Sequence, residues 1–195
     1  MEENLTANFG GAILAGGQSK RMGFDKAFLE INGEPLIAKV VRVFNEAGLS
    51  DCCIVGGDAK AFRSLGHICL PDMHPGEGPL GGIITALTSF MKQGKSHGMI
   101  VACDLPNISK DFITEMILMS IEEPKSIVVP VLEERLQWMH ALWPIEVLPV
   151  LLKSFTGGIR APWRATKDLQ LLKIEGIDPK VLFDVDEPDD LNKIC

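Results

Sequence analysis

The sequence lacks the features that mark membrane, secreted and metal-cluster proteins. No apolar run is long enough to span a bilayer, and the opening MEENLTANFG lacks the charged-then-apolar order of a signal peptide. None of the five cysteines forms a CxxC pair or a zinc-like spacing with the four histidines. We therefore expect a protein of the reducing cytoplasm, in which the cysteines act as small apolar side chains.

Positive residues are also outnumbered by negative ones. The 19 lysines and arginines stand against 26 aspartates and glutamates, which gives a formal net charge of −7 at pH 7. This balance argues against nucleic acid or an anionic membrane as a partner, although a local basic site for a small anion remains possible. The chain has 195 residues, of which 46% are hydrophobic and 23% charged. These values predict an ordinary globular protein with a single domain over residues 1–195.

Apolar runs of strand length alternate with segments of helical period. We predict strands at 9–16, 52–57, 67–70, 98–104 and 126–131, and helices at 35–48, 78–94 and 109–121. Such a pattern is typical of an α/β domain with a mostly parallel sheet and helices on both faces. The pattern is looser after Pro130, where we expect a strand at 136–144, a helix at 145–155 interrupted at Pro149, a strand at 169–174 and a short helix at 187–194.

A glycine pair and a group of cations follow the first predicted strand, in AILAGGQSKRMGFDK. Ligands of open α/β sheets bind beyond the carboxyl ends of the strands. Gly16 and Gly17 lie at such an end, where glycine lets backbone N–H groups approach an anion closely. Lys20, Arg21 and Lys26 add positive charge. The stretch therefore has what a triphosphate requires.

Two known phosphate-binding loops do not fit this stretch. The phosphate loop of kinase-like nucleotidases needs Gly-Lys-Ser/Thr, whereas Gly23 is followed by Phe24 and Asp25. The dinucleotide fingerprint G-x-G-x-x-G does not match either. On these residues alone, a solvated turn with incidental lysines remains an open alternative.

The longer segment from Leu14 to Leu36 resembles the nucleotidyltransferase signature L-A-(G/A)-G-x-S-x-R-M-G-x-D-K-x-x-L-x-x-x-G-x-P-L without a break. Its Gly-Gly and Asp-Lys pairs are most similar to those of the molybdenum cofactor guanylyltransferases (MobA-like). This resemblance implies a three-layer α/β/α, Rossmann-like fold of the nucleotide-diphospho-sugar transferase type. It also implies nucleotide contacts at Leu14, Ala15, Gly16 and Gly17, and phosphate neutralisation by Arg21 and Lys26.

A carboxylate that could hold a metal follows the strand in MIVACDLP. Nucleotidyl transfer needs a cation among the phosphates, and Mg²⁺ prefers one or two carboxylates with phosphate and water in the other positions. Asp104 fits this role, although an Asp that accepts backbone N–H bonds in a turn is an equal alternative on these residues alone. The resemblance implies that Asp104 is the magnesium ligand.

A second block of the resemblance is LPDMHPGEGPLGGI. It implies that Asp72 lies near the nucleotide, with Gly78, Pro79 and Leu80 beside it. Free N–H groups at a helix start favour anionic or carbonyl groups of a ligand. A plain proline-led helix start suits Pro79 equally well.

The last third of the chain matches the family more loosely. Arg160 matches a basic position and could bind the acceptor phosphate, whereas Arg164 is better interpreted as an exposed loop arginine. In LFDVDEPDDL, Asp184 and Asp186 stand where the family commonly has asparagines, and Gly56 stands where an Asn is often found. We assign these two acids to acceptor binding, and the acceptor's identity stays open.

The resemblance implies that Arg21, Lys26 and Asp104 catalyse transfer of GMP from GTP to the phosphate of the molybdenum-pterin cofactor, with Mg²⁺ and release of pyrophosphate. Transient contact with cofactor-insertion proteins is a further expectation. One alternative is a sister transferase that uses CTP or another phosphorylated acceptor. Another is a non-catalytic nucleotide-binding regulator. His140, in an apolar run, is interpreted as a core histidine.

Overall fold

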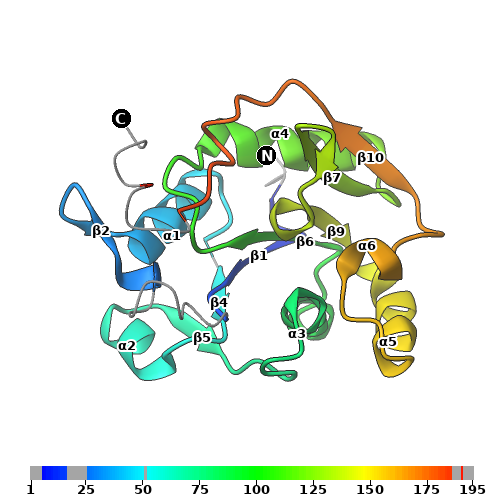
Figure 1. Cartoon of the computed structure of the whole chain (residues 1–195), viewed down its shortest axis with the longest axis horizontal. Coiled ribbons are helices and arrows are strands. Elements are labelled where there is room, and N and C mark those ends of the chain that lie inside the picture. Colours follow the sequence, from blue (N-terminus) through cyan, green and yellow to red (C-terminus); the bar gives the residue numbers. More distant parts are fainter. Residues whose placement is uncertain (1–5, 17–25, 51, 186–189, 191–195) are drawn as a thin grey trace.

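One mixed, mostly parallel β-sheet forms the centre of the protein (Figure 1). A computed structural model describes residues 6–16, 26–50, 52–185 and 190. Within these residues the sheet has eight strands: β1 (Phe9–Leu14), β4 (Cys53–Val55), β5 (Ile68–Leu70), β6 (His97–Ala102), β7 (Ile127–Leu132), β8 (Arg135–Leu136), β9 (Leu142–Pro144) and β10 (Leu171–Ile174). Their order is β10-β7-β9-β6-β1-β4-β5, and β8 pairs with the carboxyl end of β7.

The centre of the sheet is parallel, as its continuous apolar strands predict. β1 pairs in parallel with both β4 and β6, and β4 pairs in parallel with β5. The chain thus moves outward from β1 to β5 and then returns to place β6 on the other side of β1. A reversal of strand order is where open α/β sheets bind ligands, so the carboxyl ends of β1 and β6 are the expected location of a site.

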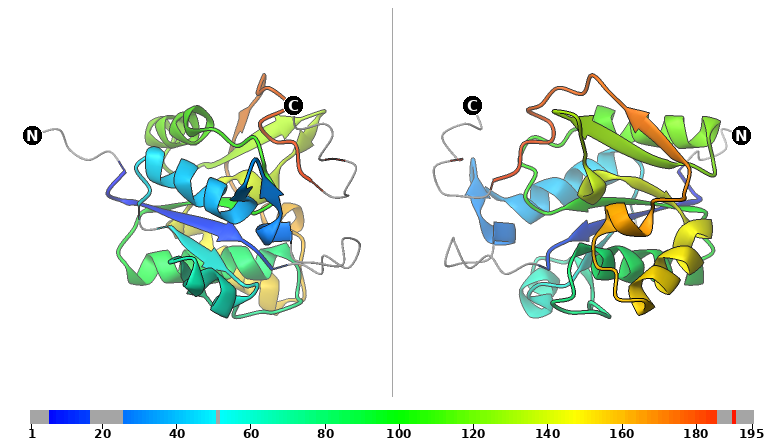
Figure 2. Two further views of the ribbon diagram at one scale, coloured as in Figure 1. Left: turned by 90° about the vertical axis from the view of Figure 1, so that its left-hand side faces the viewer. Right: turned by 45° about the vertical axis from the view of Figure 1, so that its right-hand side comes forward.

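Helices cover both faces of the sheet, which confirms the predicted three layers (Figure 2). Helices α1 (Leu36–Glu46) and α4 (Lys110–Glu122) pack on one face, and α3 (Pro79–Lys92) and α5 (Leu148–Thr156) pack on the other. Side chains alternate along β1 because successive residues of a strand point to opposite faces. Ile13 accordingly joins the core under α1, whereas Ala12 and Leu14 join the core under α3.

Two glycines in β1 let aromatic rings from the helices reach the strand. A Cβ at Gly11 would lie 2.5 Å from the ring of Phe44 in α1, and a Cβ at Gly10 would overlap the ring of Phe90 in α3. Both rings are fully buried or nearly so. Any larger side chain at either glycine would push a helix away from the strand, so these residues set the distance between the layers.

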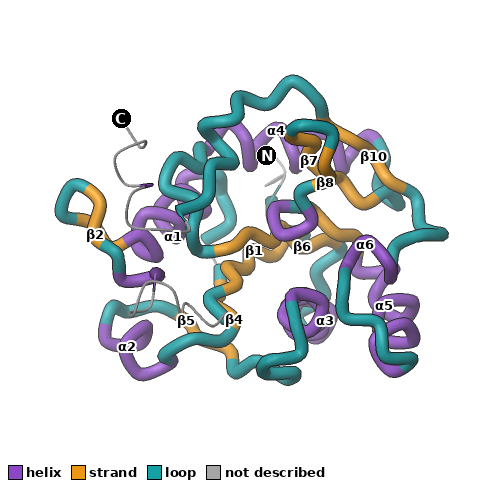
Figure 3. Tube along the Cα trace, viewed as in Figure 1, coloured by secondary structure: helices purple, strands orange, loops and turns teal. Residues whose placement is uncertain are grey.

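The segment 136–144 is not the single strand that we predicted. The chain leaves β8, makes one 3-10 turn, η2 (Trp138–His140), and only then enters β9 (Figure 3). Glu133 and Glu134 reverse the chain with positive φ angles of 49° and 62°, so that β8 pairs with β7. The chain must then turn out of line before β9 can insert antiparallel between β6 and β7. The apolar pattern of this segment cannot show that β8 pairs with β7 whereas β9 pairs with both β6 and β7.

The predicted interruption at Pro149 is also wrong. A 3-10 turn, η3 (Ile145–Val147), comes first, and α5 then begins at Leu148 with Pro149 in its first turn. Proline is tolerated there because the first N–H groups of a helix have no partner within the helix. Pro149 therefore starts the helix and does not break it.

Several short elements were not predicted, namely η1 (Lys26–Phe28), the hairpin of β2 (Glu30–Ile31) and β3 (Glu34–Pro35), α2 (Ala59–Ser64) and α6 (Pro162–Ala165). Asp58 caps α2 by accepting hydrogen bonds from the backbone N–H groups of residues 60 and 61. The short helix predicted at 187–194 falls almost entirely outside the described residues. Within the described part of the chain, no helix combines the length and the hydropathy that crossing a bilayer requires.

Candidate functional site

Three strands of the sheet end side by side at one edge. The backbone N–H of Ala15 donates to the carbonyl of Val55 over 3.0 Å, and the N–H of Cys103 donates to the carbonyl of Leu14 over 3.1 Å. These hydrogen bonds hold together the segments that follow β1, β4 and β6. Gly16 and the loop that carries the predicted metal ligand therefore lie together at this end of the sheet.

Gly16, Gly56 and Asp72 come from three different loops and are in contact. A Cβ at Gly56 would lie 3.2 Å from Gly16 Cα and 3.8 Å from Asp72 Cβ, and Gly56 has a φ of +79°. The Asp72 carboxylate is oriented by His74, whose backbone N–H donates to Oδ1 over 2.9 Å, and by the Thr85 hydroxyl 3.1 Å from the same oxygen. Gly56 was noted above as a departure from the family, and this close approach gives a physical reason for a glycine there.

These loops enclose a cavity of about 680 Å³, which we name the Gly16 pocket. Its lining includes residues predicted from the sequence to contact a nucleotide, namely Leu14, Gly16, Asp72, Gly78 and Pro79. It also includes residues that were not predicted: Val55, Gly56, Gly57, Pro75, Gly76, Gly82 and Met139. Ala15 and Leu80 are buried in the two cores instead, and Gly17 lies outside the described residues.

The lining of the Gly16 pocket is rich in backbone and poor in charge. Six of its twelve residues are glycine, and among these described residues Asp72 carries the one ionisable side chain. Helix α3 begins at Pro79 on the rim of the pocket, and its first N–H groups favour a partner with negative or carbonyl character. The pocket therefore offers a ligand mainly backbone groups and a single carboxylate.

Lys26 and Asp104 meet, although one lies near the start of the chain and the other near its middle. Lys26 Nζ is 3.9 Å from Asp104 Oδ2, and the two side chains are 13% and 22% exposed. The 3-10 turn η1 presents Lys26, and the turn that follows β6 presents Asp104. The sequence-based prediction required these two groups in one place, and the fold brings them together. Arg21, the third predicted catalytic residue, lies outside the described residues.

A second cavity of about 560 Å³, which we name the Trp163 pocket, adjoins the first. Pro79 and Met139 line both pockets. The Trp163 pocket is lined in addition by Ala102, Asp104, Leu136, Gln137, Trp138, His140, Arg160, Ala161, Pro162, Trp163 and Asp184. The three predicted residues in this set are Asp104, Arg160 and Asp184. The second cavity therefore holds the predicted acceptor residues Arg160 and Asp184 together with Asp104, which was predicted to bind the nucleotide and its metal ion.

Arg160 is held by its own surroundings. Its Nη1 donates to the carbonyls of Phe155 (2.7 Å) and Ile159 (3.2 Å), and its Nη2 pairs with Glu77 Oε2. The guanidinium carbon also lies 4.0 Å from the centre of the Phe155 ring. To bind a phosphate, Arg160 would have to leave Glu77 or share its remaining N–H groups.

The end of the described chain is attached to the Asp104 loop. The backbone N–H of Val185 donates to the Asp104 carbonyl over 3.0 Å, which places the exposed Asp184 at the Trp163 pocket. Asp186 lies outside the described residues. Within the described residues, no group of three or more His, Cys, Asp or Glu side chains is arranged to hold a metal ion.

His140 lies beneath this pocket as a buried neutral base. It is 6% exposed, and its Nδ1 accepts a 3.4 Å hydrogen bond from the backbone N–H of Ala102. Burial lowers the pKa of His140 to about 4, so that the ring is uncharged at neutral pH. This agrees with its interpretation as a core histidine.

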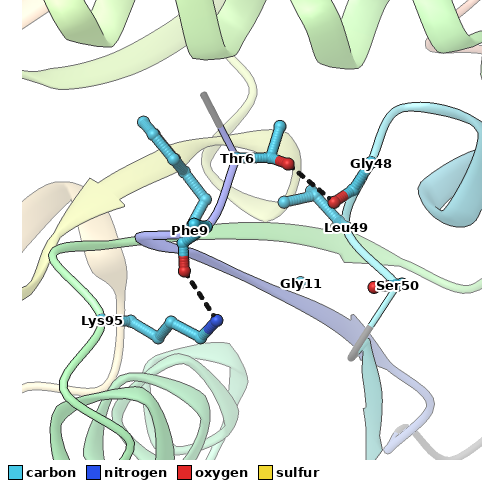
Figure 4. A pocket seen from close by; sticks show the side chains of 8 residues that line it. Thr6, Phe9, Gly11, Gly48, Leu49, Ser50 and Lys95 are labelled. Carbon is cyan, nitrogen blue, oxygen red and sulfur yellow. Dashed lines mark hydrogen bonds between the residues drawn. The ribbon is translucent and has the colours of Figure 1, made fainter. Parts of the chain in front are cut away.

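A smaller cavity of about 240 Å³ lies at the opposite edge of the sheet, where β1 begins (Figure 4). Thr6 Oγ1 donates to the Gly48 carbonyl over 2.8 Å, and Lys95 Nζ donates to the Ala7 carbonyl over 2.9 Å. Both polar side chains thus tie neighbouring backbone segments to each other. These contacts explain the cavity's polar groups without a ligand.

Comparison with known proteins identifies the family. Residues 11–169 match the family model of the MobA-like NTP transferase domain. The chain belongs to the MobA-like NTP transferase family. This confirms the resemblance seen between Leu14 and Leu36, and it makes the protein a member of a nucleotidyltransferase family.

Relatives of this MobA-like protein carry informative names. It is 33% identical over 133 residues to the "Probable molybdenum cofactor guanylyltransferase" of Clostridium perfringens, a match that covers 68% of this chain and 64% of the relative. It is 29% identical over 193 residues to the protein of the same name from Thermococcus sibiricus, covering 94% of this chain and 96% of the relative. Molybdopterin-guanine dinucleotide biosynthesis protein A of Archaeoglobus fulgidus shares the fold, with a TM-score of 0.77, 20% identity and coverage of 94% and 95% of the two chains.

Sequence reasoning missed Met139 and Trp163 because neither belongs to a recognisable motif. Met139 reaches both pockets from the unpredicted turn η2. Trp163 lies on the four-residue helix α6, which is too short to give a periodic signal. The one sequence feature that could have drawn attention to Trp163 is its place in GGIRAPWR, between two arginines that were considered as anion ligands.

Proposed function

We propose that this MobA-like protein transfers GMP from GTP to the terminal phosphate of a molybdenum-bearing pterin and releases pyrophosphate. The names of the two relatives support the choice of nucleotide and acceptor. The observation that carries the proposal is the 3.9 Å pair of Lys26 and Asp104 beside two adjoining pockets, because a transferase needs room for two substrates next to its charged groups.

In this proposal the Gly16 pocket binds the guanosine part of GTP. Glycine backbone at Gly16 and Gly56 lets a flat base or ribose approach closely, and the Asp72 carboxylate can accept hydrogen bonds from N–H or O–H groups. The triphosphate then extends toward Lys26. The acceptor enters the Trp163 pocket, which Asp104 lines and which shares Pro79 and Met139 with the Gly16 pocket.

The reaction is a direct displacement. An oxygen of the acceptor phosphate forms a bond to the α-phosphorus of GTP, and the bond from that phosphorus to the bridging oxygen of the β-phosphate breaks. The electron pair leaves with pyrophosphate, so no covalent intermediate with the protein is needed. Lys26, together with Arg21 as predicted, stabilises the departing negative charge. The work of the protein is to position two anions in line and to offset their repulsion.

The residues at Asp104 fit a magnesium ion. Mg²⁺ takes one or two carboxylates and completes its coordination with phosphate oxygens and water, so a cluster of three protein ligands is not required. Asp104 offers a partly exposed carboxylate, and Asp184 lines the same pocket. When bound, the ion would neutralise charge on the phosphate oxygens.

The proposal is tested by measuring pyrophosphate release with Mg²⁺ and each of GTP, CTP, UTP and ATP, with and without the molybdenum-pterin acceptor. Release with GTP that depends on the acceptor is expected. Release with CTP would indicate the sister transferase, and tight GTP binding without release would indicate a regulator. Asp168→Asn is the matched control for Asp104→Asn, because Asp168 is an exposed carboxylate before β10, away from the carboxyl ends of the strands.

A further inference from the structure

The geometry points to Trp163 as a stacking platform for a planar heteroaromatic ring of the acceptor, a role that rests on the proposed function. Trp163 is 57% exposed, and among the described residues it is the one strongly exposed large aromatic side chain. Burying aromatic surface is favourable, so an indole that stays more than half exposed gives the core only a small part of its stabilising area. An indole that is exposed inside a concave site instead offers its surface to a ligand.

Helix α6 is fixed while its tryptophan faces outward. Pro162 and Ala165 are buried, and Thr166 Oγ1 donates to the Pro162 carbonyl over 3.0 Å. Trp163 lies between these anchors and lines the pocket that Asp104 also lines. The platform is therefore held by the core and needs no rearrangement before a ligand arrives.

Arg164 contacts the indole ring of Trp163. Its guanidinium carbon lies 4.9 Å from the centre of the Trp163 ring, a cation–π arrangement over one face of the indole. More than half of the Trp163 side chain stays exposed despite this contact. Arg164 was interpreted from the sequence as an exposed loop arginine; in the structure it is exposed, and it lies on α6 against the Trp163 ring.

The rest of the pocket suits a flat ring with N–H donors. Trp138, Met139 and Pro162 supply apolar walls, and the volume of about 560 Å³ is large enough for a fused heterocycle. The exposed Asp184 carboxylate can accept hydrogen bonds from ring N–H or amino groups. An acceptor that carried only phosphate and aliphatic carbon would use neither the indole nor this carboxylate.

The first test uses the full chain labelled with 5-fluorotryptophan, which has three fluorine signals because the sequence has three tryptophans. Trp163→Phe assigns the Trp163 signal. Titration with pterin-6-carboxylate is expected to shift that signal and to leave buried Trp143 unchanged, whereas glycerol 3-phosphate and GTP are expected to leave Trp163 in place. A Trp163 signal that stays fixed with the pterin, or that moves with GTP alone, overturns the inference.

The second test separates stacking from a structural role. Trp163→Ala is expected to raise the KM for the acceptor about tenfold and to leave the KM for GTP unchanged. Trp163→Phe, which keeps a stacking ring, should stay within about threefold of the parent protein. Leu118→Ala is the control, because Leu118 is 51% exposed on α4 and lines neither pocket. Equal KM values for Trp163→Ala and the parent overturn the inference.

The two tests distinguish this inference from the proposed function. If the protein transfers GMP but Trp163→Ala has no effect on the acceptor, the inference fails and the proposed function stands. If the protein does not use the molybdenum-pterin acceptor but the pterin still shifts the Trp163 signal, the inference stands and the proposed acceptor is wrong.

Discussion

The buried imidazole of His140 makes the stability of this fold depend on pH. The ring is 6% exposed and lies against β6, where its Nδ1 accepts the N–H of Ala102. Burial lowers the pKa of His140 to about 4 in the folded protein. In the unfolded chain the pKa of the same group is about 6.5. The two states therefore bind different numbers of protons between these values.

The direction and size of the effect follow from this difference. As the pH falls below about 6.5, the unfolded chain takes up a proton that the folded protein excludes, so acid favours unfolding. The contribution of His140 is complete above that pH and is lost as the pH falls toward 4. Applied to the two pKa values, linkage gives a loss of about 2 kcal/mol between pH 7.5 and pH 5.

Urea denaturation at pH 7.5 and pH 5 measures this loss. The perturbation is His140→Asn, because an asparagine Oδ1 can accept the Ala102 N–H but does not titrate. Burial also lowers the pKa values of His67 and His97, so the parent protein has contributions that the variant keeps. The free energy of unfolding should fall about 2 kcal/mol less in the variant than in the parent. A folded variant with the parental pH dependence would refute the reasoning.

Three further predictions concern the site. Asp104→Asn should lower kcat about a hundredfold at nearly unchanged unfolding free energy, and full pyrophosphate release would remove Asp104 from the mechanism. Gly56→Ala should weaken GTP binding in calorimetry and lower the free energy of unfolding in urea by about 1–2 kcal/mol. The reason is that Gly56 has a φ of +79° and that the new Cβ would lie 3.2 Å from Gly16 Cα. Unchanged GTP affinity and unfolding free energy would contradict this. Glu77→Gln removes the carboxylate that pairs with Arg160, so it should lower the KM for the acceptor and leave the KM for GTP unchanged. A changed KM for GTP with an unchanged KM for the acceptor would contradict a role of Arg160 in acceptor binding.

Much of the fold could be predicted because its signals are local. Strands that must be buried on both faces are apolar throughout, and this pattern indicates helices on both sides of a parallel sheet. The strand predicted at 136–144 was wrong because its path depends on contacts that are distant in the sequence. Its residues are apolar enough for a strand, but the reversal at Glu133 and the turn η2 depend on which strands are already paired.

For the candidate site, too, the sequence indicated which residues to consider, and the fold determined where they lie. Sequence reasoning selected Lys26 and Asp104 by residue type and motif, and their catalytic roles stay predictions until the variants are measured. Their separation of 3.9 Å is a product of the fold, because η1 and the end of β6 are distant along the chain. The exposure of Trp163 could not be predicted either, because the exposed area of a side chain depends on what packs around it.

The sequence by itself therefore determined the layered α/β architecture and selected Lys26 and Asp104 as candidates, since strand patterns and motifs depend on residues that are neighbours in the chain. Only the tertiary structure decided that β9 runs antiparallel inside the sheet and that Pro79 and Met139 border both cavities. Strand partners and concave surfaces arise from segments far apart in sequence, and packing energy selects them for the chain as a whole.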